Sequence, residues 1–442
     1  MKTRSWSVWI TTAALVFCHE ANAQVPFTLS ASLTNGTFVR SVAAADVNND
    51  GKPDLICVRG NPSMLYVWTN RGGGIFVSNA SYAVGSFPYQ VIAADVNNDG
   101  WPDLVTANST GKSLSVLTND GTGGFVLAST LSLGSPSAPQ SVVAADFNGD
   151  GRLDLVCANS QSASFTVWTN SGSGNFVANA TFIVGTPSSI VPKWVTMADI
   201  NGDGKPDIIG ACNNIGGSFL FAWTNNGAGG FASAPMPFIS SGILCVVAAD
   251  VNGDGKPDLA LLTSQVTVLT NNGSGGFALS GNYSVGTSPY AVVAADVNGD
   301  GWVDLITCNQ GNNTLTVLTN NGSGIFGLNA TLTVGSGPEA LTAADVSGDG
   351  RVDLISGNWN DGSLTVLTNA ATFLPRLTLK RSGNNVLVSW PAIWVNWTLK
   401  QNTSLATGSW TGFSGPIGSD GTTQTATNLL PSANRFFRLS NP

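Results

Sequence analysis

A nine-residue pattern of oxygen-bearing side chains occurs seven times in this chain of 442 residues. Its form is D-x-N-x-D-G-x-x-D, and the first copy runs from Asp46 to Asp54. Side-chain oxygens at positions 1, 3 and 5 can surround one hard cation, and Gly at position 6 permits a sharp turn. The carbonyl of residue 7 and the carboxylate at position 9 can complete a shell of roughly six to eight oxygens. The pattern therefore predicts Ca²⁺ loops, whereas Mg²⁺ fits less well because it keeps more of its water.

The alternative interpretation is that Asp, Asn and Gly only form Asx turns between strands. Seven copies with three aspartates and one glycine in register favour the metal interpretation, although the last copy replaces Asn by Ser347. No copy has Glu at position 12, so none is an EF-hand loop. The predicted ligands, with residue 7 contributing its carbonyl, are Asp46, Asn48, Asp50, Lys52, Asp54; Asp95, Asn97, Asp99, Trp101, Asp103; Asp146, Asn148, Asp150, Arg152, Asp154; Asp199, Asn201, Asp203, Lys205, Asp207; Asp250, Asn252, Asp254, Lys256, Asp258; Asp296, Asn298, Asp300, Trp302, Asp304; and Asp345, Ser347, Asp349, Arg351, Asp353.

Few residues remain for other chemistry. The single histidine, His19, lies in the predicted signal segment described below, so the mature chain lacks histidine bases and histidine metal ligands. Outside the loops its carboxylates are Glu339, Asp120, Asp361 and Asp420, in different repeats or domains. We therefore predict no catalytic residues and no enzyme activity. The enzymatic alternative that survives is a calcium-assisted lyase with Lys, Arg or Tyr as the base.

The first 23 residues have the features of a secretory signal. Lys2 and Arg4 precede an apolar stretch, and Ala21-Asn22-Ala23 is an A-x-A cleavage site. We expect export, and secreted or cell-surface localisation after cleavage near Ala23. The mature chain would have 16 basic and 25 acidic residues, without a basic cluster typical of nucleic-acid binding and without a later membrane span. Its five cysteines are expected to be small buried apolar residues: Cys57, Cys157, Cys212, Cys245 and Cys308.

Each repeat of about 50 residues contains four short β-prone runs, illustrated by AVVAAD, DLITCN, TLTVLTN and ATLTVG of residues 291–335. Seven four-stranded sheets predict a β-propeller, with a linear solenoid as the alternative. The mature chain begins with a lone fourth strand at Phe27, and the last repeat stops after Asn369 without one. The N-terminal strand can complete that last sheet, which favours a closed ring. The expected fold is all-β: a seven-bladed propeller over residues 24–373 and a small sandwich over 374–442.

The repeats resemble the FG-GAP/VCBS repeats of integrin α-subunit-type seven-bladed propellers, through the Asp-rich loops, the T-N-N-G-S-G-G-F turns and V-G-x-S-P. The resemblance covers roughly residues 27–369, and it implies structural Ca²⁺ in loops that join the first two strands of a blade, with the ligands given above. The resemblance is specific for the fold and for calcium but not for any activity. The last 69 residues resemble fibronectin-III-like sandwiches of secreted bacterial proteins, with Trp390, Trp394, Trp397 and Trp410 expected in the core.

The loops take up nearly every carboxylate, so ligand binding is expected on the opposite face. Amides beside aromatic rings suit sugar hydroxyls and C–H faces, although they can equally cap strand ends and fill gaps. The residues expected there are Asn108, Asn159, Asn213, Asn309, Asn358, Tyr89, Trp194, Tyr290 and Trp359. The preferred hypothesis is a monomeric, calcium-stabilised binding or adhesion module for carbohydrate or a cell-surface protein. The alternatives are a polysaccharide lyase and a structural surface or matrix protein.

Overall fold

The computed structural model of the chain divides into two compact units, Gln24–Ala371 and the combination of Met1–Ala23 with Thr372–Pro442. We describe each unit by itself. The residues that the structure describes are 8–11, 14–16, 24–34, 36, 38–187, 189–214, 217–239, 242–370, 378–382, 385–391, 398–402, 411–419, 423–429 and 435–440. In these residues every regular element is a strand, and no helix could cross a membrane.

The larger unit contains seven antiparallel sheets, numbered here as blades 1 to 7, each with four strands along its main path. The strands follow one another in sequence in blades 1 to 6, whereas blade 7 takes its fourth strand from the start of the unit. The first strands are β4 (Val39–Ala45), β8 (Pro88–Ala94), β12 (Pro139–Ala145), β16 (Val191–Ala198), β21 (Cys245–Ala249), β25 (Pro289–Ala295) and β29 (Pro338–Ala344). The second strands are β5 (Asp54–Arg59), β9 (Asp103–Asn108), β13 (Asp154–Asn159), β17 (Asp207–Asn214), β22 (Asp258–Leu262), β26 (Asp304–Asn309) and β30 (Asp353–Asn358).

The third strands are β6 (Met64–Asn70), β10 (Ser113–Asn119), β14 (Ser164–Asn170), β18 (Gly217–Asn225), β23 (Val266–Asn271), β27 (Thr314–Asn320) and β31 (Ser363–Asn369). The fourth strands are β7 (Phe76–Ala83), β11 (Phe125–Ser132), β15 (Phe176–Ile183), β19 (Phe231–Ala234), β24 (Phe277–Tyr283), β28 (Phe326–Thr333) and β3 (Phe27–Thr34). A short extra strand, β20 (Phe238–Ile239), also pairs with β18 of blade 4.

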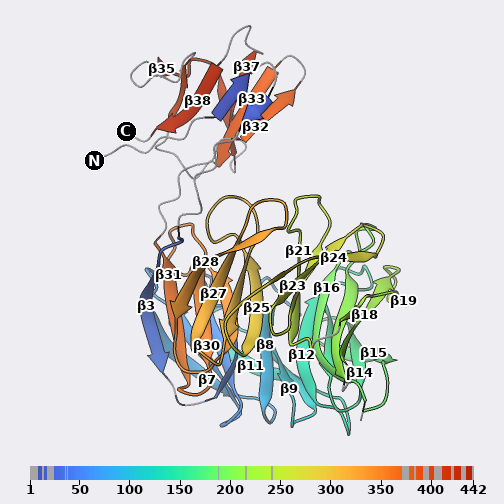
Figure 1. Cartoon of the computed structure of the whole chain (residues 1–442). Coiled ribbons are helices and arrows are strands. Elements are labelled where there is room, and N and C mark those ends of the chain that lie inside the picture. Colours follow the sequence, from blue (N-terminus) through green and yellow to red (C-terminus); the bar gives the residue numbers. More distant parts are fainter. Residues whose placement is uncertain are drawn as a thin grey trace. The chain divides into compact units, whose positions relative to one another are not determined.

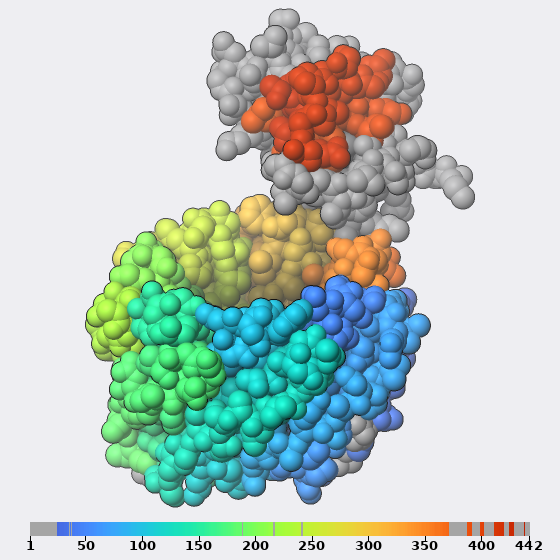
Figure 2. Space-filling model, turned by 180° about the vertical axis from the view of Figure 1, so that it is seen from behind, coloured from blue at the N-terminus to red at the C-terminus, as the bar shows by residue number. Residues whose placement is uncertain are grey.

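The blades form a closed ring. β3, from the start of the propeller, pairs with β31 over seven residue pairs from Phe27–Asn369 to Thr34–Ser363, as the incomplete repeats predicted. First strands of successive blades contact one another, and β29 of blade 7 contacts β4 of blade 1. Figure 2 shows the same closure, because the orange end of the repeat region lies beside its blue beginning. This arrangement is a β-propeller and excludes the linear solenoid (Figure 1).

The core lies between neighbouring blades. Second strands such as β9 and β26 are buried along their whole length, which explains their continuous apolar runs. Fourth strands such as β7 are mostly exposed and alternate in burial because they form the outer edge. Each apolar cluster joins two blades, for example Val105 and Leu114 of blade 2 with Leu155 of blade 3. The five cysteines predicted to be buried and apolar are free and buried, and burial raises the thiol pKa, to about 11 for Cys57.

One strand prediction was wrong in its bounds. The fourth strand of blade 6 was expected from Ala330, where β-branched residues concentrate, but it begins at Phe326. Asn320 and Phe326 already pair, so the hairpin is tighter than residue preference alone suggests.

The smaller unit contains two sheets. One consists of β32 (Thr378–Ser382), β33 (Asn385–Pro391), β37 (Thr423–Leu429) and β36 (Ile417–Ser419). The other consists of β2 (Ala14–Val16), β1 (Val8–Thr11), β38 (Arg435–Ser440), β34 (Thr398–Asn402) and β35 (Thr411–Gly412). Trp390 is buried, whereas Trp394, Trp397 and Trp410 lie outside the described residues. A sandwich and a cleaved signal segment therefore stay predictions, and cleavage near Ala23 would remove β1 and β2.

Candidate functional site

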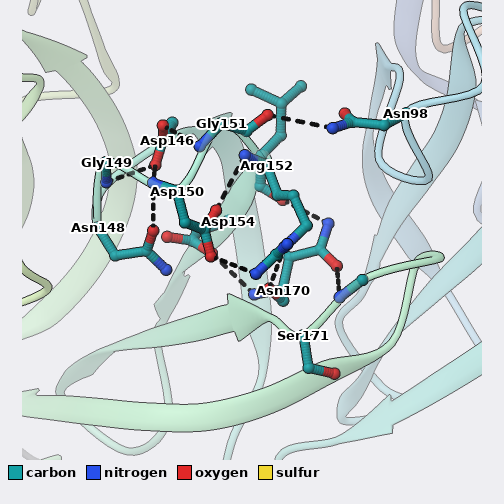
Figure 3. A network of polar contacts seen from close by, with 12 residues as sticks. Asn98, Asp146, Asn148, Gly149, Asp150, Gly151, Arg152, Asp154, Asn170 and Ser171 are labelled. Carbon is teal, nitrogen blue, oxygen red and sulfur yellow. Dashed lines mark hydrogen bonds and ion pairs between the residues drawn. The ribbon is translucent and has the colours of Figure 1, made fainter.

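Each Asp-rich loop connects the first and second strands of its blade, and loop 3 shows the shared geometry (Figure 3). Asp146 accepts hydrogen bonds from the amides of Gly149, Asp150 and Gly151 at 2.7, 3.2 and 2.8 Å. The Asn148 side-chain oxygen accepts the Asp150 amide at 2.9 Å. Position 6 has a positive φ in every loop, +81° at Gly151, so the glycine at this place has the conformational role that the sequence predicted.

The position-9 aspartates differ from the others because they are fully buried. Asp154 accepts the Phe147 amide at 3.2 Å and the Asn170 amide at 2.7 Å. Equivalent bonds occur in the other six loops. Burial raises the pKa of all seven of these carboxyls, to about 7 for Asp304, and charges of other loop aspartates raise it further. Each loop thus concentrates mutually repelling carboxylates.

The donor set fits Ca²⁺ in its chemistry, because the predicted side-chain ligands are all oxygens and carboxylates keep lone pairs after accepting an amide. In five loops a position-7 Lys or Arg also pairs with the position-5 Asp, as Arg152 does with Asp150 at 2.7 Å. Within the described residues, no three His, Cys, Asp or Glu side chains form a group that could hold a metal in this conformation. The loop hydrogen bonds are also those of Asx turns, so Ca²⁺ binding stays a prediction.

Seven buried asparagines connect the loops around the ring, and the sequence analysis treated them only as part of hairpin turns. The Asn170 amide group donates to Leu153 O of its own loop at 3.0 Å and to Val96 O of the preceding loop at 2.7 Å. The equivalent residues are Asn70, Asn119, Asn225, Asn271, Asn320 and Asn369. Asn70 closes the circle by donating to Val346 O of loop 7 at 2.8 Å. The repeated T-N dipeptide ending each third strand was the available sequence signal.

Replacing one of these asparagines should destabilise the whole propeller. In Asn170→Leu, the Val96 and Leu153 carbonyls lose their hydrogen-bond donor, while the new side chain has nearly the same shape as the old one. Buried unsatisfied groups cost about 1–3 kcal/mol each, so we expect a loss of about 2–5 kcal/mol in unfolding free energy. Urea denaturation would measure it. Asn175→Ala is the matched control, because Asn175 lies in the same hairpin but is exposed. Equal stability of the two variants would contradict the inter-blade role.

A second cluster occupies the opposite end of the first strands, where a β-bulge leaves one residue out of register. The bulged residues include Arg40 of blade 1, Tyr89 of blade 2, Tyr290 of blade 6 and Glu339 of blade 7. Arg40 donates to the Tyr290 hydroxyl at 2.8 Å and pairs with Glu339 at 2.5 Å. The Tyr89 and Tyr290 hydroxyls are 2.7 Å apart. Because these contacts join non-adjacent blades, the residues meet at the ring axis, and we call Arg40, Tyr89, Tyr290, Glu339 and Trp359 the axial cluster.

Aromatic rings hold the Arg40 guanidinium in place. The Arg40 Cζ atom lies 3.8 Å from the Trp359 ring centroid and 4.9 Å from the Tyr89 ring centroid. Arg40 Nε is buried and has no hydrogen-bond partner among the described residues. Burial raises the pKa of Tyr290 and of Glu339, although the Arg40 charge opposes both shifts. Tyr89, Tyr290 and Trp359 were predicted on this face from the sequence, whereas Arg40 was not, because it belongs to no repeated motif.

The asparagines expected on the same face have another role. Asn108, Asn159, Asn309 and Asn358 are fully buried, and Asn213 is half-buried. Asn108, for example, donates to Ser115 Oγ at 2.9 Å and accepts from Thr106 at 3.0 Å. The four fully buried asparagines cap strand ends and are not available to a ligand, and the Asn213 side-chain oxygen accepts from Ser218 and from the Ile243 amide. Trp194 also fills space, since it packs against the two clusters that flank blade 5.

An open pocket of about 700 Å³ lies beside the axial cluster, over blades 5 and 6. Blade 5 creates the space because its second-to-third-strand loop is short: Asp258 and Asn271 are 13 residues apart, against 16 for Asp304 and Asn320. Most of the lining surface is apolar and includes Leu244, Val285 and Pro289. The lining also offers hydroxyl groups, an aromatic ring and an amide, from Thr263, Ser264, Thr287, Ser288, Tyr290 and Gln310. Gln310 donates to Glu339 Oε1 at 2.6 Å, which links the pocket to the axial cluster.

Comparisons with known proteins agree with this architecture. FG-GAP-like repeats match residues 46–106, 95–157, 146–210, 199–261, 262–307 and 296–356. A solved structure of BBS1N in complex with ARL6DN is similar at 13% identity and a TM-score of 0.56, over 79% of this chain and 99% of that one. An Agrocybe aegerita lectin, solved for its recognition of non-reducing terminal N-acetylglucosamine, aligns at 21% identity and a TM-score of 0.49, over 76% and 86%. The search of curated proteins finds no match.

Proposed function

The chain belongs to the FG-GAP-like repeat family, and on that premise we propose that it is a secreted carbohydrate-binding module stabilised by Ca²⁺. In this proposal the seven loops are structural and the ligand binds at the opposite end of the propeller. The two sites lie at opposite ends of the first strands. In blade 1, Arg40 stands near the start of β4 and Asp46 directly after its end, so strand geometry separates the two sites by roughly 20 Å.

Bound Ca²⁺ would neutralise the carboxylates that repel one another in each loop. The residues of the chain arrange those carboxylates beforehand. Loop amides orient the Asp at positions 1 and 5, while the buried position-9 Asp holds the asparagine that reaches the neighbouring loop. A stabilised loop would therefore support its own blade and the one before it.

The pocket over blades 5 and 6 is the observation that carries the carbohydrate proposal. Its volume falls within the roughly 300–1,000 Å³ of small-molecule sites. Hydroxyl groups and an amide can exchange hydrogen bonds with sugar hydroxyls, and the Tyr290 ring offers a face for sugar C–H groups. The axial cluster restrains Tyr290 through hydrogen bonds to Arg40 and Tyr89, so the orientation of this ring is fixed before a ligand binds.

A glycan array probed in Ca²⁺ buffer would test the proposal, with Ser264→Trp as the blocking variant. Ser264 is exposed in the short blade-5 loop, and an indole there would occupy the pocket. We expect at least tenfold weaker glycan binding at an unchanged melting temperature. Thr110→Trp is the control, because Thr110 is an exposed turn residue on the corresponding loop of blade 2. Equal binding by both variants, binding of a protein but no glycan, or turnover of a bound polysaccharide would each contradict the proposal.

A further inference from the structure

The two ends of the propeller unit carry opposite charge. The end with the Asp-rich loops has 22 acidic residues, namely the 21 loop aspartates and Asp120, and its basic residues are Lys52, Arg71, Arg152, Lys205, Lys256 and Arg351. The opposite end has two acidic residues, Glu339 and Asp361, and four basic ones, Arg40, Arg59, Lys112 and Lys193. The candidate ligand end is therefore the positive end, with a net charge of +2 against −16 at the other before any Ca²⁺ binds.

Lys193 is the cation at this end that has neither a carboxylate nor a hydrogen-bond acceptor as a partner among the described residues. It is the bulged residue of β16 in blade 4, the position that Arg40, Tyr290 and Glu339 hold in their blades. Glu339 pairs with Arg40, and Asp361 accepts the amides of Ser336 and Ser363. Among the residues that the structure describes, no carboxylate or hydrogen-bond acceptor pairs with Lys193.

The environment of Lys193 disfavours its charged form when no anion is bound. The side chain is half-buried; burial, and secondarily the positive charge of Arg40, lower the pKa of its ammonium group. A half-buried cation beside a second cation gains more from an anion than a lysine in water does. Two buried polar atoms at the same end also have no partner among the described residues, Arg40 Nε and Gln140 Oε1 of the blade-3 bulge.

Lys193 does not line the candidate pocket, but its strand β16 neighbours the strand that follows one of the lining residues. β16 contacts β21, the first strand of blade 5, and Leu244 directly before β21 lines the pocket. Blade 5 has no bulge at this place, so Leu244 replaces the polar residue that six other blades supply. A ligand that extends from the pocket toward the axis would therefore meet no polar side chain of blade 5 at this place.

Resting on the proposed carbohydrate function, we propose that this end binds an acidic glycan and that Lys193 pairs with a uronate carboxylate of it. Sugar hydroxyls match the hydroxyl and amide groups in the pocket lining, and the carboxylate matches the Lys193 ammonium group. The positive charge of Arg40 also attracts the carboxylate, although Arg40 itself stays paired with Glu339. Association should weaken as salt concentration rises, because a charge pair at a partly exposed site is screened.

The test uses the protein from residue 24 to 442 with saturated Ca²⁺ and two probes, trigalacturonate and its fully methyl-esterified form. The ester removes the charge and leaves the sugar rings unchanged. We expect calorimetry to show about tenfold tighter binding of the acid than of the ester. In Lys193→Gln the preference should disappear at an unchanged melting temperature. Lys112→Gln, at a half-buried lysine of the same end that binds Ser135 Oγ, should keep it.

The outcomes separate the two proposals. Equal affinity for acid and ester, binding of neutral glycans only, or an acid preference retained in Lys193→Gln would overturn the acidic-glycan inference and leave carbohydrate binding intact. Tighter binding of poly-glutamate than of trigalacturonate would assign the cation to an acidic protein partner and overturn the inference. Absence of binding to these probes and to every glycan of the array would overturn both.

Discussion

Removal of Ca²⁺ is expected to lower the melting temperature of the protein by more than 10 °C. Extracellular loops of this type bind at about 10⁻⁴ to 10⁻³ M, so 10 mM Ca²⁺ exceeds the dissociation constant by roughly 10- to 100-fold. Each site then contributes about 1.4–2.7 kcal/mol by mass action, and seven independent sites about 10–19 kcal/mol. Differential scanning calorimetry in 10 mM Ca²⁺ and in EDTA measures the difference.

Two controls make the Ca²⁺ result specific. Mg²⁺ at 10 mM should restore little of the stability, because it prefers sites with fewer protein ligands. Asp150→Asn should remove one site from a calorimetric titration, since the amide still accepts the Arg152 N–H but carries no charge. Identical melting curves in Ca²⁺ and EDTA would show that the loops are Asx turns only, which their internal hydrogen bonds also permit.

Deletion of residues 24–34 is expected to destabilise the propeller by several kcal/mol. β3 contributes little apolar burial, because most of its side chains are exposed. Its main contribution is the ladder with β31, which spans seven residue pairs, at about 0.5–1.5 kcal/mol net for each hydrogen bond. The deletion also removes the Val25 N–H bond to Asn329 at 2.8 Å. The melting temperature should fall by roughly 10 °C, and the exposed edge of β31 should promote aggregation.

A synthetic peptide of residues 24–34 provides the rescue control, because an exposed sheet edge can accept an added strand. Truncation after Leu374 is the matched deletion and should leave the propeller transition in place, since the two compact units divide near that residue. The ring should not open completely without β3. Apolar packing between blades 1 and 7, which includes Val39 and Ile355, and the Asn70–Val346 bond also close it. A deletion variant as stable as the parent would contradict the closure role of β3.

The sequence alone determined the propeller and the composition of its loops. Both depend on short-range patterns repeated seven times, so errors in one copy are corrected by the others. The glycine turn in each loop, the strand that follows the loop, and the pairing of the N-terminal strand with the last sheet were all predicted from spacing. The role of Asn170 was readable in principle from its repetition. Its acceptor in the preceding blade was not, because 74 residues separate Asn170 from Val96.

Only the tertiary structure decided which residues come together in the axial cluster. Arg40 lies 250 residues from Tyr290 and 299 from Glu339, and no pattern in the chain connects them. Ring closure brings the first strands together, and a β-bulge turns one residue of each out of register at the axis. The asparagines of this face could not be assigned from the sequence, because an asparagine that caps a strand and one that binds a sugar are the same residue type in the same pattern. Burial separates these cases, and burial is a property of the closed ring rather than of any single repeat.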